Sequence, residues 1–109
     1  MNSSSEVVVV ATIAVKPGSE DAALAALTEA IGKTHAEEGC LAYALHRDLD
    51  DPSRFVIVER WASAAALERH AQEPHLKALF AAVGPLASAP PVIVRTAAIA
   101  AGDAAKGVL

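Results

Sequence analysis

Hydrophobic and polar positions alternate most clearly from Phe55 to Trp61. If this segment is a strand, Glu59 and Trp61 close a face that is otherwise apolar. Burying a carboxylate is costly unless a partner satisfies it, so Glu59 needs a nearby hydrogen-bond donor or a solvated cavity. The pattern therefore predicts a strand that carries an acid on a packed face.

The first half of the chain gives three further elements. A β-branched run from Val7 to Val15 has two apolar faces, which predicts a strand covered on both sides. Apolar residues at helical spacing predict a helix over about 19–38, with Ser19 before its first turn and Gly39 after its last. Alternation over 40–48 and the turn formers that follow predict a hairpin with the strand from Arg54 to Trp61.

The second half predicts a helix that begins after Ser63, is interrupted near Pro74 and continues to Gly84. A last strand is expected over 91–101. The resulting order of elements is that of an α+β, ferredoxin-like βαββαβ domain, a four-stranded antiparallel sheet with helices on one face. We expect a single domain over 1–109, with a core at about 7–101 and loose termini at 1–6 and 102–109.

Such a fold would leave the second face of the sheet uncovered, although the first strand is apolar on both faces. An exposed apolar patch of this size is unusual in a soluble monomer. A homodimer with its two sheets face to face would cover it.

Composition narrows the class of protein. The formal net charge of -4 disfavours a nucleic-acid-binding surface. A lone cysteine, Cys40, is typical of a reducing compartment, and the first residues lack the basic start of a signal peptide. The apolar run at 7–15 is too short to span a membrane. We expect a cytoplasmic protein without nucleic-acid or membrane partners.

Two histidines are candidates for proton transfer. His70 and His75 are five residues apart, and a helix break at Pro74 would let both lean towards the sheet. His70 could be a general base near neutral pH, or it could only satisfy Glu59. His75 could contact a substrate or cap a helix.

Three further side chains have two interpretations each. Trp61 could stack on a flat substrate ring or belong to the core. Tyr43 could donate a hydrogen bond to a bound oxygen or only pack, and His35 could reach a pocket mouth or lie half solvated. No histidine pair has the i, i+4 spacing of a helical zinc motif, and no glycine-rich phosphate loop is present, so neither a metal nor a nucleotide cofactor is expected.

An ordered set of short motifs resembles the antibiotic biosynthesis monooxygenase family, in particular its small stand-alone quinol monooxygenases. The motifs run from about residue 7 to 98 and comprise Glu38-Gly39-Cys40-Leu41-Ala42-Tyr43, Asp50-Asp51-Pro52, Phe55, Glu59-Arg60-Trp61, His70 and Pro74-His75. The resemblance implies a dimeric αβ barrel with a pocket between sheet and helices. It also implies oxygenation of a phenolic or quinol substrate by dioxygen without metal, flavin or haem.

The resemblance is uneven at the pocket. Trp61 matches a tryptophan of the polyketide-oxidising members, but Ile57 stands where they carry an asparagine. Residues 7–15 contain no asparagine, so the haem degradation of related enzymes is not expected.

We therefore expect a cofactor-independent monooxygenase that acts on a small quinol or polyphenol. In this hypothesis His70 is the base, Glu59 orients it and Trp61 forms a wall of the pocket. The alternatives are a non-catalytic small-molecule-binding or stress-related dimer, and an isomerase or lyase that acts on a small oxygenated metabolite. Dependence on dioxygen separates the first hypothesis from the other two.

Overall fold

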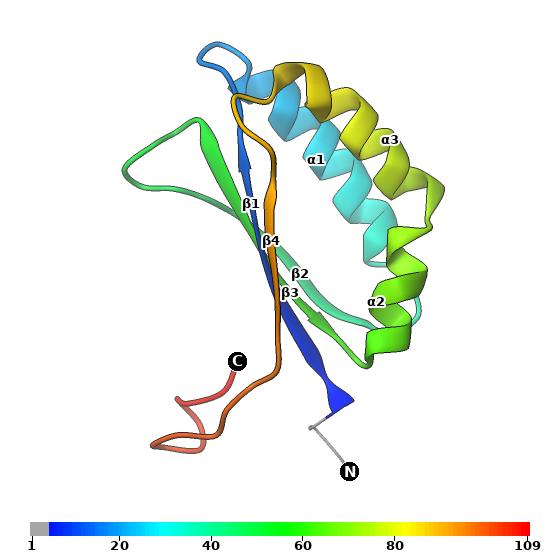
Figure 1. Cartoon of the computed structure of the whole chain (residues 1–109), viewed down its shortest axis with the longest axis vertical. Helices are drawn as coiled ribbons and strands as arrows, with labels where there is room; N and C mark the ends of the chain where they lie inside the picture. Colours follow the sequence, from blue (N-terminus) through cyan, green and yellow to red (C-terminus); the bar gives the residue numbers. More distant parts are fainter. Residues whose placement is uncertain (1–4) are drawn as a thin grey trace.

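The computed structural model describes residues 5–109; residues 1–4, and with them most of the predicted loose N-terminus, lie outside the described residues. Four strands form one antiparallel sheet in the order β2-β3-β1-β4: β1 (Val7–Ala14), β2 (Cys40–Arg47), β3 (Arg54–Trp61) and β4 (Val92–Thr96). One face is covered by α1 (Glu20–Thr34), α2 (Ala64–Ala71) and α3 (Pro74–Val83), and a 3₁₀ turn, η2 (Gly84–Leu86), leads to the last strand (Figure 1). The predicted ferredoxin-like α+β fold is confirmed.

The core lies between the sheet and the helices. On β3 every second side chain is buried, and these are the predicted row of Phe55, Ile57, Glu59 and Trp61. Because β1 lies beside β3 with Val9 opposite Glu59, its own alternate residues extend the same buried layer. Period-two alternation therefore placed the acid on the helix-covered face.

The first helix ends earlier than predicted. α1 stops at Thr34, and residues 36 and 37 continue with hydrogen bonds to carbonyls three residues back instead of four. Gly39 does have a left-handed φ of +89°, but it belongs to the turn into β2, where an added Cβ would lie 2.5 Å from the Ala66 Cβ. Glycine is thus favoured here both by the positive φ of this turn and by the close approach of α2.

The second helical region is divided as expected. The Ser63 hydroxyl accepts a hydrogen bond from the Ala66 N–H at 3.1 Å and begins α2. Pro74 then occupies the first turn of α3, where a missing N–H costs nothing, and the chain changes direction between the two helices. This break determines where His70 and His75 point.

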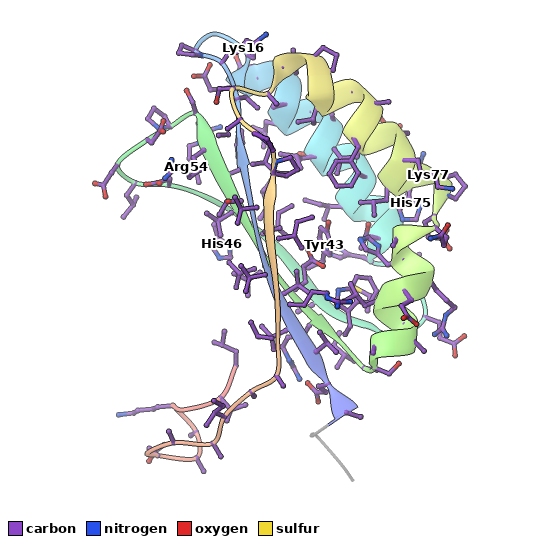
Figure 2. All side chains as sticks on the ribbon, viewed as in Figure 1. Lys16, Tyr43, His46, Arg54, His75 and Lys77 are labelled. Carbon is purple, nitrogen blue, oxygen red and sulfur yellow. The ribbon has the colours of Figure 1, made fainter. Side chains whose placement is uncertain are left out.

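The opposite face of the sheet is open and apolar in the single chain. Val10 on β1 is paired with Val58 on one side and with Val94 on the other, so three valines form one row across the sheet. Val94 is 50% exposed. His46 also points to this side, whereas Tyr43 points towards the helices (Figure 2).

The last strand is shorter than predicted. β4 has five residues, all of them exposed, and residues 97–109 leave the sheet on the side away from the helices (Figure 1). Within this tail the Gly107 N–H donates to the Asp103 carbonyl at 2.8 Å. Ile99 and Leu109 are 82% and 77% exposed, so the tail adds apolar surface on the open side.

Candidate active site

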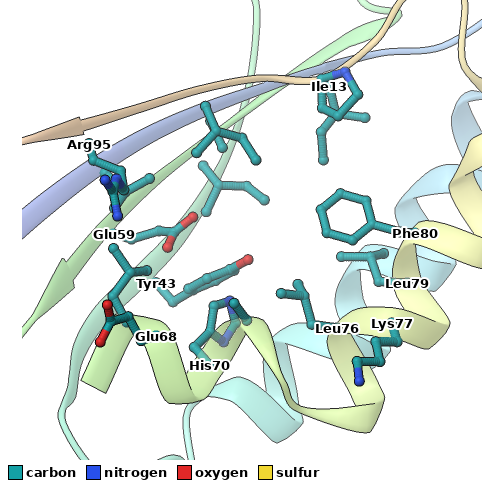
Figure 3. A pocket seen from close by; sticks show the side chains of 17 residues that line it. Ile13, Tyr43, Glu59, Glu68, His70, Leu76, Lys77, Leu79, Phe80 and Arg95 are labelled. Carbon is teal, nitrogen blue, oxygen red and sulfur yellow. The ribbon is translucent and has the colours of Figure 1, made fainter. Parts of the chain in front are cut away.

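A pocket of about 320 Å³ lies between the sheet and helices α2 and α3. Its walls are mostly aliphatic, and Ile13, Leu79 and Phe80 lie at one end (Figure 3). Glu59, Tyr43 and His70 gather at the other end. A small, largely apolar cavity with a few convergent polar groups is typical of a small-molecule site.

Glu59 finds its partner on its own strand. The Trp61 indole Nε1–H donates a hydrogen bond of 2.9 Å to Glu59 Oε1, two residues away on the same face of β3. Burial raises the pKa of the Glu59 carboxyl to about 7, the Glu37 charge adds to this, and the indole hydrogen bond partly opposes it. Glu59 is therefore a buried acid that can exchange a proton near neutral pH.

His70 is bonded to a different carboxylate from the one expected. Its Nδ1 lies 2.7 Å from Oε2 of Glu37, which is in the turn after α1. No hydrogen bond joins Glu59 to His70 among the described residues. The second ring nitrogen, Nε2, has no hydrogen-bond partner in the described part of the chain, and the ring lines the pocket.

Glu37 also holds His75. The His75 Nε2 lies 2.6 Å from the same Oε2, so two imidazoles meet one carboxylate oxygen. The side chains of Glu37, His70 and His75 are 9%, 5% and 11% exposed, so the cluster is nearly closed to solvent. Glu37 was not among the predicted site residues, because nothing in the local pattern around a helix end shows which side chain it will meet 33 residues later.

Tyr43 is placed to contact a ligand. It lines the pocket, and its hydroxyl has no hydrogen-bond partner among residues 5–109. Burial, together with the charges of Glu59 and Glu37, raises the pKa of Tyr43, so the phenol keeps its proton. It can therefore donate a hydrogen bond to an oxygen bound in the pocket.

The remaining predicted residues lie around the pocket and not in its lining. Trp61 is fully buried behind the pocket, with its ring centre 4.6 Å from that of His70. His75 bonds to Glu37 and is not in the pocket lining. His35 is outside the lining too, and its Nε2–H donates a hydrogen bond of 2.9 Å to the backbone carbonyl oxygen of Tyr43. Their roles in substrate binding stay predictions.

Two cationic side chains line the pocket in addition to the acidic Glu59. Arg95 on β4 lies in the same cross-strand row as Val9 and Glu59, and Lys77 comes from α3. Neither forms an ion pair within the described part of the chain. Positive charge therefore faces the pocket from two elements, the edge strand β4 and helix α3 (Figure 3).

One group of side chains has the composition of a metal site. The nearest ligand atoms of Glu37, His70 and His75 all lie within 4.8 Å of one another, which sequence spacing alone did not indicate. Such a set could hold a transition metal ion. The same atoms already satisfy each other through the two hydrogen bonds, so an ion would have to displace both protons. That the protein uses no metal stays a prediction.

A family model described as "Antibiotic biosynthesis monooxygenase" matches residues 6–82, which include β1 to nearly the end of α3. The chain belongs to the antibiotic biosynthesis monooxygenase family. The family membership supports a monooxygenase-type function at the level of the family. β4 lies beyond the matched residues.

Several individual proteins are similar to this chain over most of their own length. "Putative monooxygenase YcnE" of Bacillus subtilis is 32% identical over 90 residues, 83% of this chain and 95% of that protein. "Probable quinol monooxygenase YgiN" of Escherichia coli is 35% identical over 85 residues, 69% of this chain and 82% of that protein. The solved structure of Rv0793 from Mycobacterium tuberculosis superposes with a TM-score of 0.83 at 32% identity, covering 91% of this chain and 100% of that chain.

No helix within residues 5–109 combines the length and the apolar character that crossing a bilayer requires.

Proposed function

We propose that this protein is a cofactor-independent monooxygenase that oxidises a small quinol or polyphenol in the pocket between its sheet and helices. The observation that carries the proposal is the pairing of two unsatisfied polar groups with an apolar cavity. His70 Nε2 and the Tyr43 hydroxyl have no hydrogen-bond partners among the described residues, and both residues line the pocket. A flat phenolic ring would fill the apolar part and offer its hydroxyl to these groups.

In this proposal His70 is the catalytic base. Its Nε2 takes the phenolic proton, and the resulting phenolate is electron-rich enough to transfer an electron to dioxygen. For a phenol oxidised to a quinone, one atom of dioxygen becomes the new carbonyl and the other leaves as water with two substrate hydrogens. The substrate itself supplies all four electrons, so no further reductant is needed.

The other pocket residues bind and position the substrate. Tyr43 donates a hydrogen bond to a substrate oxygen, and the free oxygen of Glu59 accepts one from a substrate hydroxyl. Trp61 supports both ends of this arrangement, because its indole holds Glu59 and its ring packs on His70. Glu59 in this account contacts substrate and does not orient the histidine.

We also propose that a second copy of the chain covers the open face of the sheet. The row of Val58, Val10 and Val94 is apolar, and the tail presents Ile99 and Leu109 on the same side. A two-fold axis would bring this face against its own copy, so the patch would be its own complement. Two such sheets would form the dimeric αβ barrel.

The experiment that tests the enzymatic proposal is oxygen consumption by metal-free protein with a panel of quinols. We expect uptake above the autoxidation rate, and we expect His70→Ala to reduce kcat by about 10²–10⁴-fold, the usual contribution of a general base. Arg69→Ala is the matched control, since Arg69 is the exposed neighbour of His70 on α2 and does not line the pocket. Full activity in His70→Ala would contradict the assignment of the base. Stoichiometric ligand binding without oxygen uptake would instead favour a binding protein.

A further inference from the structure

Three parts of the chain meet at one carboxylate oxygen behind the pocket. Glu37 comes from the turn after α1, His70 from the last turn of α2 and His75 from the first turn of α3. We propose that Glu37 and His75 are positioning residues that hold His70 in the tautomer able to act as a base. This inference rests on the proposed function for its kinetic consequence, whereas the tautomer itself can be measured without any substrate.

The hydrogen bonds determine which ring nitrogens carry protons. An ionised carboxylate only accepts hydrogen bonds, so both imidazole nitrogens that face Glu37 Oε2 must present an N–H. Neutral imidazole has a single N–H. With its proton on Nδ1, His70 therefore has a lone pair on Nε2, the nitrogen that has no partner and can be reached from the pocket.

The carboxylate also stabilises the product of proton transfer. When Nε2 takes a proton from the substrate, the His70 ring becomes an imidazolium whose Nδ1–H lies 2.7 Å from the negative Glu37. In a site where the two side chains are 5% and 9% exposed, little water screens this attraction. Glu37 can thus favour the charged ring at the step where charge develops.

His75 keeps the carboxylate in place. Its Nε2–H occupies the second lone pair of Oε2 at 2.6 Å, so that oxygen has both of its acceptor directions filled. On the outer side, His75 Nδ1 is 3.8 Å from the Glu73 carboxylate. Without His75, Glu37 would lose one of its two donors and could turn away from His70.

The helix break makes this geometry possible. On one continuous helix, side chains five residues apart diverge by about 140°. Pro74 begins a new helix between the two histidines, and their ring centres come within 6.3 Å of each other. The break at Pro74 is therefore what allows two histidines near in sequence to donate to one oxygen.

The first measurement is the tautomer of His70, read from the imidazole ¹⁵N chemical shifts and proton couplings of histidine-labelled protein. We expect the neutral wild-type ring to have Nδ1–H and an unprotonated Nε2. In Glu37→Gln the amide can donate to Nδ1, which a carboxylate cannot, so we expect the signal of the Nδ1–H form to fall sharply. Glu38→Gln is the matched control, since Glu38 is exposed beside Glu37, and it should leave the tautomer unchanged.

The kinetic test follows on any quinol that the wild type oxidises. We expect Glu37→Gln to lower kcat by about 10²–10⁴-fold, the range found when the partner of a catalytic histidine is changed to an amide, with KM altered less than about threefold. His75→Leu should lower kcat by about tenfold, the lower end of the effect of supporting partners. His75→Gln, whose amide N–H can replace the imidazole donor, should recover part of that loss.

The outcomes separate this proposal from the proposed function. An Nε2–H tautomer of His70 in the wild type, or an unchanged tautomer in Glu37→Gln, would overturn the positioning role even if oxygen uptake is found. If no quinol is oxidised, an Nδ1–H tautomer that depends on Glu37 would still support the positioning role while the monooxygenase proposal fails. If Glu37→Gln does not fold, the comparison of His75→Leu with His75→Gln tests the positioning role by the same two measurements, the tautomer of His70 and kcat.

Discussion

The Trp61 indole donates a 2.9 Å hydrogen bond to the Glu59 carboxylate two residues earlier on β3, and both side chains are at least 96% buried. This single neutral donor is a weak partner for a full charge in the interior. Burial therefore raises the pKa of Glu59 to about 7, although the hydrogen bond from Trp61 lowers it. The proton on Glu59 is therefore coupled to the stability of the fold.

The coupling gives a testable dependence of stability on pH. The folded state keeps the Glu59 proton up to about pH 7, whereas the unfolded chain releases it near the ordinary glutamate pKa of 4.5. Since the folded state binds more protons in this interval, Glu59 makes stability fall as pH rises from about 4.5 to 7, by up to about 3 kcal/mol. Glu59→Gln should remove this contribution.

Urea unfolding of both proteins at several pH values between 4 and 8.5 measures the difference. The difference in unfolding free energy between Glu59→Gln and wild type should grow in favour of the variant as pH rises through this window and level off above it. A difference that does not change with pH would show that Glu59 titrates alike in both states.

A second prediction concerns Tyr43. Because its hydroxyl has no partner in the described part of the chain, Tyr43→Phe should leave the urea midpoint nearly unchanged. The same change should raise KM for the substrate by about 2–10-fold through the lost hydrogen bond. Steady-state kinetics beside the unfolding curve check both parts. A large loss of stability with unaltered KM would place the hydroxyl in the core and not at the ligand.

The open sheet face predicts the assembly state. Val94→Asp would put a charge into the proposed two-fold interface, while the residue is 50% exposed in the single chain and tolerates a polar side chain there. We expect the dimer to dissociate at least about 100-fold more readily, since a buried unpaired charge costs about 3–5 kcal/mol. Light scattering across a dilution series measures this.

The control for that experiment is Leu49→Asp, because Leu49 is 99% exposed in the turn between β2 and β3. It removes an equally apolar side chain from another place and should not alter the mass. A wild type that is monomeric at all concentrations would contradict the proposed interface.

A fourth prediction concerns metal removal. If protons and not an ion occupy the cluster of Glu37, His70 and His75, treatment with a chelator followed by its removal should change oxygen uptake by less than about twofold. Added Zn²⁺ should not raise the rate. Uptake that is lost with the chelator and returns with one equivalent of a divalent ion would place a metal at these three residues.

The part of the site that lies on one strand could be predicted from the sequence. Alternation from Phe55 to Trp61 placed Glu59 and Trp61 on one buried face because strand geometry fixes that relation locally. Tyr43, for which packing was one of two interpretations, lies on the packed side of β2 and is 6% exposed. The helix break at Pro74 was equally local, since proline cannot continue a helix.

The rest of the site depends on contacts between distant segments. The partner of His70 is Glu37, which is 33 residues earlier and lies in the turns that replace the last predicted turn of α1. Gly39 was interpreted as a helix cap, but it lies in the turn into β2, where Ala66 leaves no room for a Cβ. Neither contact produces a repeating pattern in the sequence that could reveal it. Trp61 was expected to wall the pocket and lies behind His70, because the face of a strand does not tell how deep a side chain is.

Because three elements converge on Glu37, the protein can lose its reactivity through partial unfolding. His70 and His75 are separated from Glu37 by 33 and 38 residues, so no fragment that folds locally contains the complete cluster. Fraying of the first turn of α3 alone would disconnect His75 while the sheet and the rest of α3 persist. The basicity of His70 Nε2 thus depends on contacts between distant segments of the tertiary structure. A partly unfolded or proteolytically cleaved molecule would lose its reactivity before it loses its overall fold.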